Sequence, residues 1–265
     1  MIMRRRDNKW MGRTLLVLSL SIAFLCNGCA AAEYIRAGVQ AQSEYNDGLV
    51  LYQAKEYARA IPHFERALAL QPDHDDAEAN LAWSYYYLGN YSEATRHFLQ
   101  ALVRQPSWEG LHNGLGWSRY RAGSYKLALE SFRQALALNR NFRDASVGYA
   151  YSLFEMGRYA EAMPHLERLV REGEPSSKRS AAADHEDVRS RYAWTLFYLG
   201  DYTRAREQFT KGIVARPEWS GLQNGLGWSC LRLGDKAQAQ QAFERALKMN
   251  PNLTDAKTGL AQLRP

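Results

Sequence analysis

The stretch GLHNGLGWSRYRAG at residues 110–123 is written again as GLQNGLGWSCLRLG at residues 221–234. The likeness continues on both sides, because residues 75–142 align with residues 186–253 without a gap and are identical at 28 of 68 positions. A chance match would not stay in register over so long a segment. The chain therefore contains an internal duplication, and the pattern inside the duplicated block decides the fold.

A shorter pattern repeats inside this block with a period of 34 residues. One copy runs through Gly89, Tyr91, Ala94, Phe98 and Ala101, and the next runs through Gly123, Tyr125, Ala128, Phe132 and Ala135. Units of this kind begin at residues 41, 75, 109, 143, 186, 220 and 254, so that one longer interval of 43 residues separates the fourth unit from the fifth. Repeats of this length are typical of solenoid proteins.

Each unit divides into two amphipathic segments. Apolar residues recur at spacings of three and four in AIPHFERALAL (60–70) and LALESFRQALAL (127–138), which predicts helices with one apolar face. Glycine at the fifteenth position, as at Gly89 and Gly123, allows a tight turn between the two helices. A single helical hairpin cannot bury its apolar face, so the units are expected to stack on one another.

These units resemble the tetratricopeptide repeat, and the resemblance covers residues 41–265. It implies an all-α, right-handed superhelical solenoid of stacked antiparallel helix pairs, with six repeats and a C-terminal capping helix. Two positions depart from the family pattern: Arg140 stands where a closing proline is expected, and Lys236 stands where a tyrosine is expected.

The predicted organisation follows from the unit boundaries. Repeats 1–4 occupy residues 41–172 and repeats 5–6 occupy residues 186–253, with a polar linker or extended loop at 173–185 between them. We interpret this linker as a lengthened loop or a hinge and not as a domain boundary. Residues 29–40 are expected to form a tether and a lead-in helix, and residues 254–265 the capping helix.

The N-terminal residues 1–28 have the proportions of an export signal. Basic residues precede the apolar run TLLVLSLSIAFL (14–25), which is too short to span a bilayer as a helix. Leu25-Cys26-Asn27-Gly28-Cys29 resembles the processing site of a bacterial lipoprotein, which implies that Cys29 carries lipid and anchors the chain in the outer membrane, facing the periplasm. Cys26 departs from that pattern. The alternative is ordinary signal cleavage after Ala30–Ala32 and a soluble periplasmic protein.

Charge and cysteine content exclude two classes. The formal net charge is +6, but most of it lies in residues 1–28, so the rest of the chain has no electrostatic footprint for nucleic acid. After processing, at most Cys29 and Cys230 remain, which excludes a disulfide framework. We expect Cys230 to be buried as a small apolar residue.

The family resemblance implies that the first helix of each repeat lines a concave groove. In this chain the groove positions carry an unusual number of aromatic side chains, together with a few amide and guanidinium groups. The candidate binding residues are Trp83, Tyr86, Asn113, Trp117, Tyr120, Arg121, Tyr151, Trp194, Tyr198, Asn224, Trp228 and Arg232. Trp, Tyr and Arg dominate binding hot spots, which favours a binding groove. The alternative is that the aromatic rings pack between neighbouring first helices.

Two further groups of residues have structural interpretations. Trp108 and Trp219 each precede a first helix and are expected to staple its start. Gly110 and Gly221 lie inside first helices, where they allow either close packing or close approach of a ligand. The sequence does not choose between these two roles.

The remaining motifs give no sign of catalysis. His63, His97 and His165 share one position of the second helix, and we expect them on a solvated outer face and not in a metal site. There is no glycine-rich phosphate loop and no nucleophile elbow. The sequence therefore predicts a non-enzymatic protein without a cofactor.

The expected function is that of an envelope-anchored scaffold that binds a segment of another envelope protein in its aromatic groove. Outer-membrane lipoproteins of similar architecture serve secretion, pilus or polysaccharide-export assemblies, which is an analogy of fold. The alternative is a glycan-binding solenoid, because aromatic faces also stack on sugar rings. Self-association through the solenoid ends is a third interpretation that the sequence leaves open.

Overall fold

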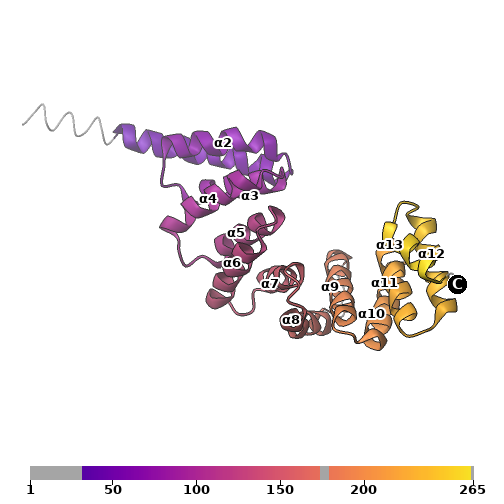
Figure 1. Cartoon of the computed structure of the whole chain (residues 1–265). Coiled ribbons are helices and arrows are strands. Elements are labelled where there is room, and N and C mark those ends of the chain that lie inside the picture. The colour runs from indigo at the N-terminus through magenta and orange to yellow at the C-terminus, as the bar shows by residue number, and fades with distance from the viewer. Residues whose placement is uncertain (1–31, 174–178, 264–265) are drawn as a thin grey trace, which may run out of the picture. The chain divides into compact units, whose positions relative to one another are not determined.

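The computed structural model describes residues 32–173 and 179–263, and every regular element in these ranges is an α-helix (Figure 1). A first helix covers residues 32–53. The helices that follow are α2 Tyr57–Leu70, α3 Asp75–Tyr87, α4 Tyr91–Arg104, α5 Glu109–Arg121, α6 Tyr125–Leu138, α7 Arg143–Glu155, α8 Tyr159–Glu172, α9 Arg179–Tyr198, α10 Tyr202–Ala215, α11 Ser220–Arg232, α12 Lys236–Met249 and α13 Thr254–Leu263. This arrangement confirms the predicted all-α fold of stacked helix pairs.

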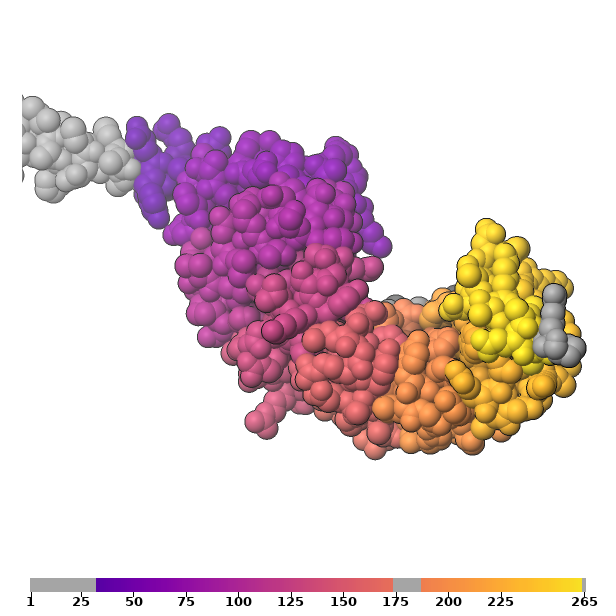
Figure 2. Space-filling view, viewed as in Figure 1, coloured from indigo at the N-terminus to yellow at the C-terminus, as the bar shows by residue number. Residues whose placement is uncertain are grey.

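The helices belong to two compact units, which divide between Gln105 and Pro106. The first unit contains the helix at 32–53 and α2, α3 and α4. The second unit contains α5 to α13. The course of the chain through each unit can be followed by its colour in the space-filling view (Figure 2). The division falls between the second and third repeats, and not at the long interval between the fourth and fifth.

Within the second unit, the first helices of successive pairs lie against one another. The backbones of α5 and α7, of α7 and α9, of α9 and α11, and of α11 and α13 approach one another closely. The backbones of the second helices α6, α8, α10 and α12 lie farther apart, and α8 and α10 are joined through the ion pair of Glu167 with Arg204. Because one layer of helices is in contact and the other is spread apart, the first-helix layer is the inner face of this unit. Side chains on these helices are therefore well placed to share a binding surface.

A phenylalanine in the second helix forms the centre of most repeats. Phe64, Phe98, Phe132, Phe209 and Phe243 are all fully buried. Full burial of a side chain of this size contributes about 1.5–3 kcal/mol. The ring of Phe132 lies between the backbones of α5 and α7, since a Cβ atom would come within 2.5 Å of the ring at Gly116 and within 2.2 Å at Gly148. Small residues in the first helices thus make room for the phenylalanine of the second.

The turns inside the helix pairs depend on glycine, as the sequence predicts. Gly89, Gly123, Gly157, Gly200 and Gly234 have φ angles between +71° and +87°. This left-handed conformation costs glycine nothing and is strained for other residues. The first pair departs from the rule, because Lys55 occupies the same turn with φ +62°.

Three segments refine the predicted organisation. The lead-in helix and the first helix of repeat 1 are continuous over residues 32–53. Helix α9 begins at Arg179, inside the predicted linker, and packs against α8. Residues 174–178 of that linker lie outside the described residues. At the C-terminal end, α13 packs against both α11 and α12.

Two sequence expectations concern single features of the chain. Cys230 is fully buried, as predicted, and burial raises the pKa of its thiol to about 11. In the part of the chain that the structure describes, no helix has the length and apolar character needed to cross a membrane. The export signal at 1–28 and the lipidation site at Cys29 lie outside the described residues.

Candidate functional site

The twelve candidate binding residues all lie on first helices, but at different depths. Arg121, Tyr198 and Arg232 are at least partly exposed at the ends of their helices. Six of the aromatic side chains are partly exposed, namely Trp83, Tyr86, Trp117, Tyr120, Trp194 and Trp228. Asn113, Tyr151 and Asn224 are buried. The structure gathers eight of the twelve into the clusters described below, namely Trp83, Tyr86, Asn113, Trp117, Tyr120, Tyr151, Trp194 and Tyr198.

The first cluster lies in the first unit, at the end of α3. We call the rings of Tyr52, Tyr57, Trp83, Tyr86 and Tyr87 the first aromatic cluster. Tyr87 stacks with Tyr57 at a centroid distance of 4.6 Å and an interplanar angle of 17°. It also stacks with Trp83 at 5.9 Å and 28°. Tyr87 is nevertheless 51% exposed, so the cluster reaches the surface.

A matching cluster lies in the second unit, at the end of α9. We call the rings of Phe154, Tyr159, Trp194, Phe197 and Tyr198 the second aromatic cluster. Tyr198 stacks with Tyr159 at 4.5 Å and 16°, and with Trp194 at 5.9 Å and 29°. Tyr198 is also 51% exposed. The two clusters thus repeat the same stack of three rings almost without change.

A polar cluster on the first-helix face of the second unit is built around Asp144. Asn113 donates a hydrogen bond of 2.7 Å from Nδ2 to Asp144 Oδ2, and Trp117 donates one of 2.9 Å from Nε1 to the same oxygen. Asp144 lies in the first turn of α7 and joins it to α5. The side-chain carbonyl oxygens of Asn113 and Asn224 are both buried without a hydrogen-bond partner.

A second polar network connects α5, α7 and α9. Tyr120 donates a hydrogen bond of 3.0 Å to Glu155, and Arg191 donates bonds of 3.0 Å to Tyr120 and 3.2 Å to Glu155. The guanidinium group of Arg191 lies 3.9 Å above the centre of the Tyr151 ring, a cation–π contact. Arg191 therefore covers the ring that the sequence suggested as a groove platform.

The electrostatic surroundings of this network keep Tyr120 neutral and Arg191 charged. Burial raises the pKa of Tyr120 to about 12. Burial acts to lower the pKa of Arg191, but Tyr120, Tyr151 and Glu155 raise it overall. The result is a fixed positive charge held beside a carboxylate, with Tyr120 as a hydrogen-bond donor. This arrangement is ordered before any ligand arrives.

The two tryptophans that precede first helices cover the starts of those helices. The Trp108 ring lies over Gly110, where an added Cβ atom would come within 2.9 Å of Nε1. The corresponding distance from Gly221 to the ring of Trp219 is 3.3 Å. Arg216 lies 4.7 Å above the centre of the Trp219 ring. These contacts support the structural interpretation of Trp108 and Trp219, and they show that both glycines serve close packing.

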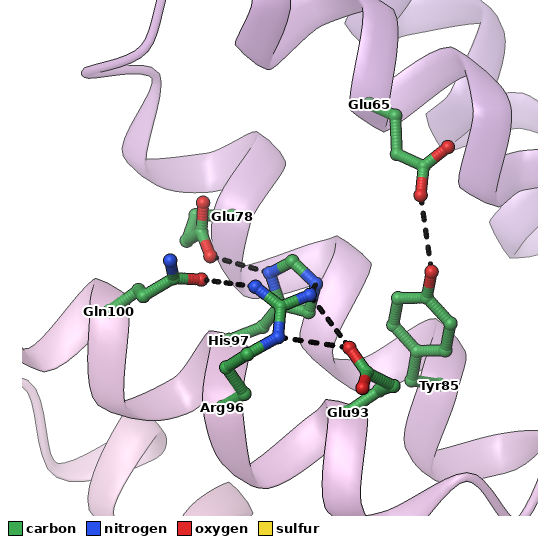
Figure 3. Close-up of polar contacts among 7 residues, drawn as sticks. All are labelled: Glu65, Glu78, Tyr85, Glu93, Arg96, His97 and Gln100. Carbon is green, nitrogen blue, oxygen red and sulfur yellow. Dashed lines mark hydrogen bonds and ion pairs between the residues drawn. The ribbon is translucent and has the colours of Figure 1, made fainter.

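The expectation for the histidines is wrong for His97. Its side chain is buried, and its Nδ1 atom lies 2.7 Å from Glu78 Oε1 in a hydrogen bond (Figure 3). The ring of Tyr85 stacks on the imidazole with an interplanar angle of 8°, and Arg96 lies beside its Nε2 atom at 2.8 Å. The reason is geometric, because this position of the second helix faces back onto the first helix of the same repeat.

The same pairing recurs in the first repeat. His63 Nδ1 lies 2.9 Å from Glu44 Oε2, and both side chains are partly exposed. His165 is half-buried against Tyr149, and burial lowers its pKa. Among the side chains that the structure describes, at residues 32–173 and 187–263, no group of three or more His, Cys, Asp or Glu is placed to hold a metal ion.

Sequence reasoning missed several residues of these clusters. Tyr57 and Tyr159 belong to the regular pattern of the repeat and gave no reason to be set apart. Glu155 and Arg191 occupy positions that are merely charged in the sequence. A signal was present for the two tyrosines, since each lies one repeat before a tyrosine at the end of a first helix. Only the stacking of neighbouring repeats brings these side chains together.

Solved structures of similar fold were found by comparison. YrrB, described as a TPR protein with an unusual peptide-binding site, matches with a TM-score of 0.62 at 18% identity, covering 75% of this chain and 97% of that one. MamA from Desulfovibrio magneticus RS-1 matches with a TM-score of 0.60 at 19% identity, covering 68% and 97%. A tetratricopeptide repeat protein from Parabacteroides merdae gives 0.57 at 18% identity, covering 93% and 96%. At these identities the likeness shows the fold alone.

Comparisons of the sequence identify the family. No curated protein matches the chain. Two family models, both described as tetratricopeptide repeat, match residues 51–113 in one case and residues 113–177, 192–254 and 224–263 in the other. Together these matches cover well over half of the chain. The chain therefore belongs to the tetratricopeptide repeat family.

Proposed function

We propose that this protein is a non-catalytic scaffold of the bacterial cell envelope that holds a segment of a partner protein on the first-helix face of its second unit. Tetratricopeptide repeat proteins are in general interaction scaffolds and not enzymes. YrrB, which has the same fold, is described as having a peptide-binding site, and this supports a peptide ligand here as well.

The observation that carries the proposal is the polar and aromatic surface formed by α5, α7 and α9. Partly exposed Trp117 and Tyr120 lie beside the carboxylates of Asp144 and Glu155. Aromatic anchors next to fixed charges are the composition of binding hot spots. An extended peptide offers backbone N–H groups, and these carboxylates can accept hydrogen bonds from them.

The order of this surface lowers the cost of binding. Arg191, Tyr120 and Glu155 already hold one another in place across three helices. A ligand that binds to preset side chains does not have to immobilise them, which saves about 0.5–1.5 kcal/mol for each. The surface is therefore suited to recognise a segment that is itself flexible.

The proposed location follows from the N-terminal sequence. Residues 1–28 supply an export signal, and Cys29 supplies a site for lipid in the outer membrane, so that the repeats face the periplasm. An anchored solenoid there would serve an assembly such as a secretion system, a pilus or a polysaccharide exporter. Mass spectrometry of the mature N-terminus tests this part, because a lipid-modified Cys29 and an unmodified N-terminus that follows Ala30–Ala32 differ in their first residue and in the mass of the attached lipid.

The binding proposal is tested by cross-linking in the native host followed by affinity purification. We expect one or more partner proteins to be captured by the wild type and lost from Trp117→Ala/Trp228→Ala. Because Trp117 packs on Phe132, helicity is checked by circular dichroism. A second variant, Arg121→Glu/Arg232→Glu, changes residues at the ends of α5 and α11 that are at least partly exposed, and gives the same loss without touching the core.

A matched control changes the opposite layer of helices. Val214 lies on the second helix α10 and is 81% exposed, so Val214→Asp is expected to keep the partner. Retention of every partner by both first-helix variants, with loss from Val214→Asp, would place the interface on the second helices. Capture of no protein, together with saturable binding of an oligosaccharide, would favour the glycan-binding alternative.

A further inference from the structure

The two aromatic clusters lie at one repeat position that does not demand an aromatic residue. Tyr87 and Tyr198 occupy the thirteenth position of repeats 2 and 5. Arg121, Glu155 and Arg232 occupy the same position in repeats 3, 4 and 6, and the helices of Glu155 and Arg232, α7 and α11, also pack on the second helix of the preceding repeat. The stacking of repeats therefore does not require a tyrosine at this position, although each tyrosine packs on a ring of the preceding repeat. They recur only where the duplication copied them.

Both clusters present apolar area to solvent. Tyr87 and Tyr198 are each 51% exposed, and the leucine that follows each of them, Leu88 or Leu199, is also exposed. An aromatic ring left half in water forgoes part of the stabilisation that burial would provide. A ligand that covers the ring recovers it. The same half-exposed tyrosine therefore marks an apolar surface in both units.

The differences between the clusters indicate the chemistry of the ligand. Tyr52 and Tyr86 of the first cluster correspond to Phe154 and Phe197 of the second, so two hydroxyl groups are absent while the ring positions stay the same. Recognition that is common to both sites must rest on the rings and on the hydroxyl groups of the stacked tyrosines. It cannot rest on a dense set of polar groups.

This pattern favours a proline-rich segment over a carbohydrate. A sugar ring carries several hydroxyl groups, and each one that is buried without a partner costs free energy. A proline-rich segment presents apolar rings and forms a polyproline II helix before it binds. Its backbone carbonyl groups are free to accept hydrogen bonds from tyrosine, and aromatic-lined surfaces recognise such segments in other folds.

We propose that Tyr57, Trp83 and Tyr87 form one binding site and Tyr159, Trp194 and Tyr198 form a second, equivalent one, and that each takes a proline-rich segment of a partner protein. One chain then binds two such segments. This inference rests on the proposed function, since it names the chemistry of a protein partner, but it uses residues other than the polar network around Arg191.

The test is a titration of the purified full-length chain in detergent with a decaproline peptide, followed by tryptophan fluorescence. Trp83 and Trp194 lie inside the two sites and report on both. We expect saturable binding of two peptides per chain. Tyr87→Ala and Tyr198→Ala should each remove one of the two sites, and the double variant should lose saturable binding.

Two controls separate recognition from a general loss of structure. Val103→Ala/Val214→Ala changes two matching residues on the second helices α4 and α10, which are 82% and 81% exposed, and is expected to leave decaproline binding unchanged. Tyr87→Phe/Tyr198→Phe keeps the rings and is expected to retain two sites with weaker binding. Circular dichroism of each variant confirms that the helices are intact, which is expected because both tyrosines are half exposed.

Three results would overturn the inference. The first is the absence of saturable decaproline binding. The second is binding that survives the Tyr87→Ala/Tyr198→Ala change. The third is saturable binding of maltohexaose in place of decaproline with the same dependence on the two tyrosines, which would make the clusters glycan sites. If decaproline fails while a cross-linked partner is still lost from Trp117→Ala/Trp228→Ala, the proposed function stands and only this inference falls.

Discussion

The third and sixth repeats begin with nearly the same helix, yet they are bonded differently. In α5, Asn113 and Trp117 both donate hydrogen bonds to Asp144 at the start of α7. In α11 the matching residues are Asn224 and Trp228, and the matching carboxylate is Asp255 at the start of α13. Within the described residues, no hydrogen bond joins Asn224 or Trp228 to Asp255.

The difference shows that a repeat takes its chemistry from the repeat that follows it. Helix α5 is followed by α7 and α9, which supply Glu155 and Arg191 to Tyr120. Helix α11 is followed by the single capping helix α13, and Leu231 takes the place of Tyr120. Nearly the same sequence thus belongs to a polar network in α5 and lies at the end of the solenoid, without that network, in α11.

The largest effect is expected on stability, when the core around Phe132 is compared with the core around Phe243. Gly148 of α7 and Gly259 of α13 both face a phenylalanine, and an added Cβ atom would lie 2.2 Å from Phe132 or 2.3 Å from Phe243. We expect Gly148→Val to lower the free energy of unfolding by about 2 kcal/mol. Gly259→Val should lower the free energy of unfolding by less, because the terminal helix α13 can move away from the Phe243 ring.

Urea denaturation followed by circular dichroism measures both changes. Gly38→Val serves as the control, since no other atom lies within 4 Å of an added Cβ there. Equal losses for Gly148→Val and Gly259→Val would mean that the capping helix is held as firmly as an internal one.

A smaller effect on stability is expected when Asp144 and Asp255 are each replaced by alanine. Asp144→Ala removes two hydrogen bonds, one of them from the buried amide of Asn113, and is expected to cost about 1–2 kcal/mol. Asp255→Ala removes no such bonds and should change stability by about 0.5 kcal/mol or less. Both residues lie in the first turn of a helix, so any interaction with the helix dipole is common to the two.

Thermal and urea denaturation of the two variants measure this difference directly. A loss for Asp255→Ala as large as that for Asp144→Ala would show that the two helix starts are equivalent in solution, contrary to the structure.

A pH-dependent effect distinguishes Tyr120 from Leu231. Burial raises the pKa of Tyr120 from 10.0 to about 12 in the folded chain. The unfolded chain therefore loses this proton first as the pH rises, so the contribution of Tyr120 to stability is complete below pH 10 and is lost between pH 10 and 12. We expect Tyr120→Leu to weaken this alkaline loss of stability.

The measurement is the urea midpoint of unfolding at neutral pH and at intervals between pH 10 and 12. The difference in midpoint between wild type and variant is plotted against pH, and its slope is compared. Because Tyr192 also has a pKa raised to about 12, mainly by burial, Tyr192→Phe gives a matched comparison. An unchanged slope in Tyr120→Leu would mean that Tyr120 is not shielded from water.

The smallest expected effect compares Cys230 with Arg119, its counterpart in the third repeat. Cys230 is fully buried and burial raises the pKa of its thiol to about 11, so little of it is the reactive thiolate at pH 8. In a chain that starts at Ala30, we expect a thiol reagent to modify Cys230 far more slowly in buffer than in urea. Arg119→Cys in a Cys230→Ser background should react faster, since Arg119 is partly exposed. Equal rates would contradict the burial of Cys230.

The fold could be predicted in detail because it is local and repetitive. In repeats 2–6 a glycine follows the first helix in the left-handed conformation, and in every repeat except the fourth, which has Leu166, a phenylalanine of the second helix lies in the core. Both features depend on contacts within one repeat or between neighbours. The candidate surface was predicted only in part, since the helices were correct but the depth of Asn113, Tyr151 and Asn224 was not evident.

By itself, the sequence determined the number of repeats and the recurrence of aromatic side chains on the first helices, and the family resemblance implied that these helices form the inner face. The first two properties follow from a period of 34 residues and from which side chains share one face of a helix. Only the tertiary structure decided which side chains meet. Tyr57 stacks on Tyr87, Arg191 covers Tyr151 and Glu78 holds His97, because the pitch of the stacked helices sets the distance and angle between residues that the sequence places far apart.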